Sequence, residues 1–156
     1  MKLKEEILSY YNSKYPFVYV ITYEEERVVS VLSDIANEQD MSLDIWSASS
    51  INNKFLEEEP VSSVIEILEQ LATVDDKKIL LLKDFHIFIG HPVIMRIMRD
   101  ISHTIVSKGS IVIISSPVFE MPIELAKDVA VIDLPLPTYD ELREVFNRVQ
   151  VERSCV

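Results

Sequence analysis

Glycine is almost absent from this chain, with only Gly90 and Gly109 among 156 residues. A Walker A loop or a dinucleotide fingerprint needs two or three glycines close together, because the backbone approaches phosphate where a Cβ atom would clash. Gly90 and Gly109 lie too far apart in the sequence to serve either motif. The chain therefore lacks the usual loop for holding a nucleotide.

Positive charge is also scarce. The chain has 15 Lys and Arg against 26 Asp and Glu, which gives a formal net charge of −11 at pH 7. DNA and RNA attract proteins mainly through Lys and Arg, and an anionic membrane surface does the same. We therefore expect neither a nucleic acid nor a membrane as the partner.

Cysteine and long apolar runs are the remaining deficits. The single cysteine, Cys155, cannot form an internal disulfide, which is typical of a reducing compartment. No apolar run reaches the ~18 residues that a membrane span requires. The first six residues become acidic where a signal peptide would need an apolar stretch. We expect a soluble, cytoplasmic protein.

The apolar residues that are present alternate between two periods. Short apolar runs rich in β-branched residues predict strands at residues 17–22, 42–46, 78–83, 110–115 and 129–133. Stripes with helical spacing predict helices at residues 24–37, 61–72 and 91–108, with a short helix at 122–127. Strands that alternate with helices form a parallel sheet covered on both faces. The predicted fold is α/β, a three-layer sandwich with a five-stranded parallel sheet.

Local signals mark several helix ends. Pro92 follows His91 at a first helical position, where its missing N–H costs nothing, and Gly109 follows Lys108 at the expected helix end. A final helix at residues 138–149 begins with capping-box spacing between Thr138 and Glu141. We expect its apolar face to be buried; this face comprises Leu142, Val145, Phe146 and Val149.

One domain accounts for the whole length, since ~100 to 200 residues are typical of a domain. Within residues 1–156 we expect a leading helix at 1–15, an α/β core at 16–150 and a tail at 151–156. The leading helix would place Leu3, Ile7 and Tyr11 on one side.

Ligands of an open parallel sheet bind beyond the carboxyl ends of its strands. After the first strand, Glu24, Glu25 and Glu26 precede Arg27, in the place where a P-loop protein holds phosphate. Glutamates there stabilise the helix dipole but repel a nucleotide phosphate. They indicate either a well-capped helix or an acidic contact for basic residues of a partner.

Two other strand ends carry polar residues. The third strand ends at Asp84, which has the form of a Walker B carboxylate that supports Mg²⁺, but Phe85 follows it instead of a glutamate. The fourth strand ends at Ser115, where a polar side chain could sense a γ-phosphate. Without a phosphate-binding loop we expect no cofactor. An unorthodox nucleotide site around Thr22, Asp84 and Ser115 is the alternative.

Histidines and arginines form the remaining candidate groups. His86, His91 and His103 do not have the spacing of metal ligands, so we expect no metal site. Arg96 and Arg99 stand next to Asp100 on one helix, which favours a local salt bridge over a contact patch or an arginine finger. No triad motif is present, and we expect no catalytic residue. The candidates for protein contacts are Glu24, Glu25, Glu26, Arg27, His86, Arg96 and Arg99.

Several segments resemble a known family. Residues 121–125, 131–137 and 139–143 are similar to the carboxyl part of AAA ATPase cores. Residues 15–27, which contain the run T-Y-E-E-E-R, and residues 82–86, L-K-D-F-H, resemble the AAA ATPases of the hypothetical chloroplast reading frame family. Trp46 with Ser47, and residues 95–100, add to this resemblance. It implies a degenerate P-loop NTPase or AAA-like core.

In that family, these motifs belong to an N-terminal AAA-like domain without its own Walker A, and the ATPase domain follows later in the chain. The resemblance thus implies a non-catalytic interaction or regulatory module that binds an AAA ATPase or a copy of itself, and a plastid stroma becomes a second possible location. An unorthodox enzyme that binds ATP and Mg²⁺, or an N-terminal fragment of a longer AAA ATPase, are the alternatives.

Overall fold

A parallel sheet forms the centre of the molecule. The computed structural model describes residues 2–49, 60–134 and 138–154. Five strands pair in the order β2-β3-β4-β1-β5, and all their pairings are parallel. Residues 135–137, which belong to the family resemblance, and Cys155 lie outside the described residues. The strands are β1 (Phe17–Ile21), β2 (Ser42–Trp46), β3 (Lys78–Lys83), β4 (Ile111–Ser116) and β5 (Val129–Asp133).

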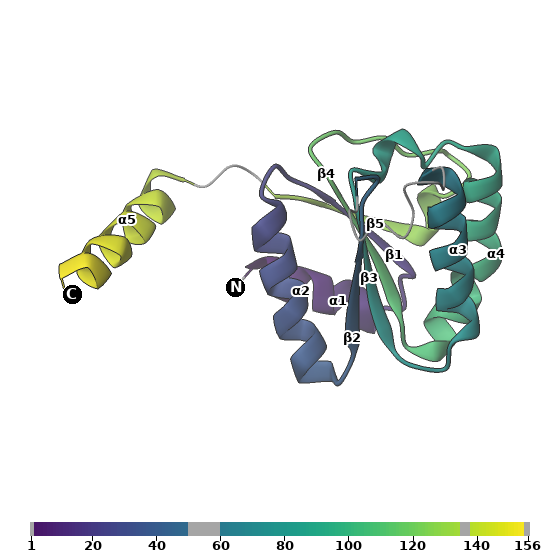
Figure 1. The fold of residues 1–156 in the computed structure, drawn as a ribbon, viewed down its shortest axis with the longest axis horizontal. Helices are drawn as coiled ribbons and strands as arrows, with labels where there is room; N and C mark the ends of the chain where they lie inside the picture. Colours follow the sequence, from purple (N-terminus) through teal and green to yellow (C-terminus); the bar gives the residue numbers. More distant parts are fainter. Residues whose placement is uncertain (1, 50–59, 135–137, 155–156) are drawn as a thin grey trace.

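Helices cover both faces of this sheet (Figure 1). One face packs against α1 (Lys2–Asn12) and α2 (Glu25–Gln39), and the other against α3 (Pro60–Thr73) and α4 (Pro92–Lys108). The predicted three-layer α/β sandwich is confirmed. The 3₁₀ helices η1 (Phe85–Ile87) and η2 (Ala126–Asp128) follow β3 and precede β5.

Alternate residues of the central strands form two separate apolar cores. Phe17 and Tyr19 of β1 face the core beneath α3 and α4, whereas Val18 and Val20 face the core beneath α1 and α2. All four side chains are fully buried. A strand buried on both faces has to be apolar throughout, which explains why β1, β3 and β4 lack polar alternation.

The predicted ends of α4 are confirmed. Pro92 occupies the first turn, and the N–H of Val93 donates to Nδ1 of His91 at 3.2 Å. At the other end Gly109 has φ 75°, and its N–H bonds to the carbonyl groups of Ile105 and Val106. A positive φ is strained for residues with a Cβ atom, so this glycine has a structural role.

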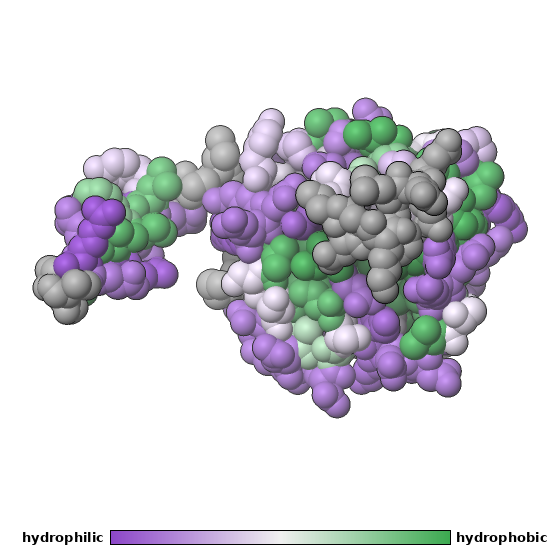
Figure 2. Space-filling view, in the orientation of Figure 1, coloured by the Kyte–Doolittle hydropathy of each residue, from purple (hydrophilic) through white to green (hydrophobic). Residues whose placement is uncertain are grey.

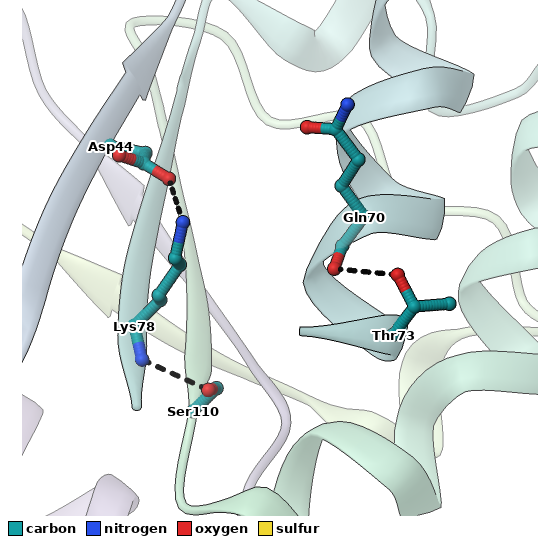
Figure 3. A network of polar contacts seen from close by, with 5 residues as sticks. All are labelled: Asp44, Gln70, Thr73, Lys78 and Ser110. Atoms are coloured by element: carbon teal, nitrogen blue, oxygen red, sulfur yellow. Dashed lines mark hydrogen bonds and ion pairs between the residues drawn. The ribbon is translucent and has the colours of Figure 1, made fainter. Parts of the chain in front are cut away.

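Polar contacts fix the start of β3 (Figure 3). The backbone N–H of Lys78 donates to Oγ of the buried Ser110 at 3.0 Å, and Nζ of Lys78 contacts Oδ2 of Asp44 on β2 at 3.1 Å. In the nearby α3, the hydroxyl of Thr73 donates to the carbonyl of Gln70 at 3.2 Å. These contacts support strand register near the amino ends of β3 and β4, away from the strand ends where ligands bind.

The predicted short helix at residues 122–127 is shorter than expected and of the 3₁₀ type. The segment forms a turn and then η2, with hydrogen bonds from the N–H of Leu125 to Pro122 and of Asp128 to Leu125, both 3.0 Å. These bonds close over three residues, as in a 3₁₀ helix. An α-helix of about six residues is too short to offset the cost of nucleation.

The predicted burial of the last helix is wrong. This helix, α5 (Tyr139–Ser154), lies away from the core in Figure 1 and runs beyond the expected end at residue 149. Thr138 caps it as predicted, since its Oγ1 accepts from the N–H of Glu141 at 3.3 Å. The four residues of its apolar face are 44 to 61% exposed. Periodicity shows which side of a helix is apolar but does not supply the surface that covers it.

Candidate functional site at the carboxyl ends of the strands

The carboxyl ends of β1, β3 and β4 meet at one edge of the sheet. The N–H of Thr22 donates to the carbonyl of Ser116 at 2.9 Å, and the N–H of Asp84 donates to the carbonyl of Ser115 at 2.8 Å. The three residues of the alternative nucleotide site, Thr22, Asp84 and Ser115, thus belong to neighbouring strand ends, as the sequence predicted. This edge is where a parallel sheet binds its ligands.

The connection between β1 and α2 is only three residues long, Thr22 to Glu24. Oγ1 of Thr22 accepts from the backbone N–H of Glu24 at 2.9 Å. The Thr22 hydroxyl thus already binds an N–H group that a phosphate would need as a donor. A Walker A motif spans eight residues, whose free backbone N–H groups surround the phosphates. The loop after β1 cannot enclose a phosphate in this way.

The glutamates after β1 make ion pairs. Oε2 of Glu24 lies 3.1 Å from Nη1 of Arg27, and Oε2 of Glu25 lies 3.7 Å from Nζ of Lys83 on β3. Glu26 is exposed on the first turn of α2. Glu24 and Glu25 thus have local structural roles, whereas Glu26 presents its carboxylate to solvent.

A small pocket opens beside this connection. It has a volume of about 160 Å³, and its walls include Thr22, Tyr23 and Glu24 from the loop and Asp133 from the end of β5. Its lining holds two carboxylates and neither Lys nor Arg. An entering phosphate would meet like charge, which costs free energy in a partly desolvated site.

Asp84 and Ser115 differ in their surroundings. Asp84 is exposed and has φ 51°, in the left-handed region that Asp tolerates better than most residues. Ser115 is 1% exposed, and no described residue supplies a hydrogen-bond partner to its Oγ. A buried hydroxyl without a partner destabilises the fold, so Ser115 is the polar group here that most clearly lacks a structural explanation.

A polar network on the other side of β4 was not predicted from the sequence. Oγ of Ser116 lies 2.8 Å from Nδ1 of His86 and accepts from the N–H of Val118 at 3.1 Å. The phenol of Tyr19 donates to the carbonyl of Val118 and accepts from the N–H of Glu120 at 3.4 Å. The network ties the chain after β4 to β1 and η1. Tyr19, whose hydroxyl stands in an otherwise apolar strand, was the available signal.

Burial determines the ionisation of Tyr19. Desolvation raises the pKa of its phenol above the ordinary value, and the negative charges of Glu120 and Asp84 act in the same direction. The hydrogen bonds with Ser116 and with the backbone of Glu120 oppose this shift. Tyr19 therefore stays neutral at physiological pH, and its phenol both donates and accepts hydrogen bonds with the chain after β4.

Of the other candidates, His86 also lies at this edge, whereas the remaining histidines and Arg96 are on or beside α4. His91 caps α4, His103 is exposed on α4, and His86 bonds to Ser116. Among the residues that the structure describes, no group of three His, Cys, Asp or Glu could hold a metal ion. Nη2 of Arg96 lies 2.8 Å from Oδ1 of Asp100, so the predicted local salt bridge is confirmed.

Comparison with known proteins identifies the family. Residues 3–134 match the family model of the N-terminal domain of SpoVK-like AAA ATPases. The chain belongs to this family. The match covers the sandwich from α1 to the end of β5 and stops before α5.

Two algal proteins of the chloroplast reading frame family are similar to this chain. The AAA domain-containing protein ycf46 of Guillardia theta is 26% identical over 145 residues, which cover 88% of this chain and 28% of that protein. Its counterpart in Trieres chinensis is 27% identical over 156 residues, covering 96% and 31%. The predicted chloroplast reading frame family is confirmed. The chain spans about 30% of the length of these curated relatives.

Solved structures support the fold. A DNA replication initiation factor superposes with a TM-score of 0.62 at 14% identity, covering 96% of this chain and 49% of that one. PCH-2 of C. elegans gives a TM-score of 0.61 at 12% identity, covering 88% and 44%. The sandwich is thus an AAA-type P-loop fold.

Of the described helices, none has the length and apolar character needed to span a bilayer.

Proposed function

We propose that this AAA-type domain is non-catalytic and works through protein contacts, with an AAA ATPase or a second copy of the chain as its partner. The observation that carries the proposal is the connection after β1. It has three residues instead of a phosphate-binding loop; Oγ1 of Thr22 already accepts from the backbone N–H of Glu24, and the Glu24 carboxylate pairs with Arg27 of α2.

The charge of the strand-end surface favours a basic protein partner over a nucleotide. Glu26 is exposed, Glu24 lines the adjoining pocket, and Asp133 lies on the pocket's other side. Carboxylates on a surface attract Lys and Arg of a partner and increase the rate of association. The same carboxylates repel the phosphates of ATP.

Charge reversal tests the acidic contact. A variant with Glu24, Glu25 and Glu26 changed to Lys is compared with wild type in affinity capture from the native host. The matched control changes Glu66, Glu69 and Asp75, which are exposed on and after α3, to Lys. We expect the first variant to lose partners that the control retains. Equal capture by all three proteins would refute the contact.

A second function, ATP and Mg²⁺ binding at an unorthodox site, is favoured by the unpartnered hydroxyl of Ser115 beside Asp84. A ligand at a hundredfold excess over its Kd stabilises a fold by ~2.7 kcal/mol, which a thermal shift detects. No shift at millimolar Mg²⁺-ATP excludes this function. Stabilisation that is lost on Ser115→Ala would support it.

The length of the relatives allows the same contacts to occur within one protein. The chain corresponds to about 30% of each algal relative, whose name includes an AAA domain. If the native protein is longer, the partner of this domain is the ATPase part of the same chain. The mass of the protein isolated from its host distinguishes contacts within a chain from contacts between chains.

A further inference from the structure

Two exposed features of the described residues could form one contact: an apolar helix face, and a groove with exposed isoleucines at its border. The first is the α5 stripe, which we define as Leu142, Val145, Phe146 and Val149. These residues recur at spacings of three and four, so they share one face of the helix. Among the described residues α5 has no extensive contact with another element, and Figure 1 shows it away from the sandwich. A stripe of this kind normally packs against another apolar surface.

The second surface is a groove between η1 and the chain after β4, which we call the η1 groove. It has a volume of about 330 Å³ and is lined by Ile87, Glu120, Met121 and Pro122 among others. At its borders Ile87 is 70% exposed and Ile123 is 85% exposed. Figure 2 shows apolar surface both on α5 and at the top of the core, where η1 and the β4–β5 connection lie in Figure 1. Exposed isoleucines beside a concavity are typical of a protein-binding site.

The groove has a stable shape. The polar network of Tyr19 and Ser116 holds Val118 and Glu120, and the ring of Phe119 packs edge-on against that of Tyr19 at 5.3 Å. Its other wall begins at Phe85, which is fully buried. A preformed groove loses little conformational entropy on binding.

The charges beside the two surfaces are complementary. Arg153 follows Val149 by four residues and therefore continues the α5 stripe. It forms no ion pair with any residue that the structure describes. Glu120 lines the groove, and Glu124 is exposed next to Ile123. A helix seated through Phe146 would bring a cation to this acidic border.

The two surfaces of one molecule lie on opposite sides of the sheet. Leu134, from which the chain leads to α5, packs with the core beneath α1 and α2, whereas Met121 packs with the core beneath α3 and α4. The helix is directed away from the groove of its own molecule (Figure 1). A second molecule can present its groove to α5 without this restriction.

We propose that the α5 stripe binds in the η1 groove of a second copy of this chain, a helix-in-groove contact with Phe146 as the anchor. The inference rests on the proposed function in protein contacts and specifies the partner as the chain itself. The contact joins two different surfaces, so it is heterologous and extends into a ring or an open row of subunits.

Mixing two variants tests this contact. Phe146→Asp breaks the stripe, and Ile123→Asp breaks the groove border; both side chains are mostly exposed, so each variant should fold. Sedimentation velocity of the purified chain should show association of wild type, and monomers for each variant alone. A mixture of the two variants retains one intact stripe and one intact groove, so it should form a dimer and nothing larger.

A control variant outside the α5 stripe and a charge-swap pair complete the test. Val151 is as exposed as Phe146, at 61%, but lies off the stripe, so Val151→Asp should associate like wild type. Arg153→Glu should weaken association, and mixing it with Glu120→Arg should restore it. A wild-type monomer at every concentration, or no complex in the variant mixture, would overturn the proposal. So would association of Ile123→Asp equal to wild type, which indicates contact between two α5 helices.

Failure here and failure of the proposed function are distinguishable. A monomeric chain that still loses partners when Glu24, Glu25 and Glu26 are reversed retains its function in protein contacts but not the contact between copies. A chain that associates through α5 but keeps all its partners after that charge reversal supports the contact between copies and not the acidic contact with another protein.

Discussion

Neighbouring serines at the end of β4 should respond to alanine substitution with opposite signs. Both Ser115 and Ser116 are 1% exposed. Ser116 bonds to His86 and to the N–H of Val118, whereas Oγ of Ser115 has no partner among the described residues. Burial of a hydroxyl without a hydrogen bond costs ~1 to 3 kcal/mol in proteins. Ser115→Ala removes that cost and leaves only a one-atom gap.

We expect Ser115→Ala to raise the free energy of unfolding by about 1 kcal/mol, which is about 2 to 4 °C in Tm for a chain of this size. Ser116→Ala should lower it by about 1 to 3 kcal/mol, because it removes two hydrogen bonds, with His86 and with the N–H of Val118, each worth about 0.5 to 1.5 kcal/mol. Urea unfolding followed by the fluorescence of the single Trp46 measures both. Destabilisation by Ser115→Ala would refute the reasoning and show that an ordered water or an ion satisfies the hydroxyl.

Substitutions at four further positions test the fold and the network. Tyr19→Phe should cost about 1 to 3 kcal/mol through the lost bonds to Val118 and Glu120. Burial raises the pKa of Tyr19, so as the pH rises the unfolded state loses the phenol proton before the folded state does. The contribution of the neutral phenol to the free energy of unfolding is therefore complete below about pH 10 and decreases above it. Wild type should therefore lose stability faster than Tyr19→Phe above that pH; parallel pH profiles would contradict the assignment. In urea unfolding of the monomer, Phe85→Ala should lower the free energy of unfolding by ~3 to 5 kcal/mol, because Phe85 is fully buried. Phe146→Ala should lower it by less than ~0.5 kcal/mol, because Phe146 is mostly exposed. Similar losses for the two variants would mean that α5 is packed in solution. Asp84→Val should lower stability by ~1 to 2 kcal/mol because φ is 51°, whereas Asp84→Gly should stay within ~1 kcal/mol of wild type; equal Tm values for these two variants would exclude backbone strain at this position.

The sandwich could be predicted because its strands and helices differ in period. Central strands such as residues 78–83 are apolar throughout and need cover on both faces, and amphipathic helices stand between them in the sequence. The cap at His91 and the left-handed Gly109 also follow from local chemistry. These features depend on near neighbours in the chain, which is why one sequence was sufficient.

Features that depend on distant contacts could not be predicted. The stripe of α5 has the same pattern as a buried helix, and only the finished sandwich shows that both sheet faces are already covered. The bond between Ser116 and His86 joins residues 30 positions apart, with α4 between them in the sequence. At the strand ends, the sequence identified Thr22, Asp84 and Ser115 but not which of them has a hydrogen-bond partner.

The central claim is that this domain does not bind nucleotide at the carboxyl ends of its strands. Isothermal titration of Mg²⁺-ATP into the chain tests this claim without assumptions about a partner. We expect no binding heat at millimolar nucleotide, because only three residues join β1 to α2 and carboxylates line the adjoining pocket. A Kd in the micromolar range that weakens on Asp84→Asn or Ser115→Ala would contradict the claim and place a nucleotide at this edge of the sheet.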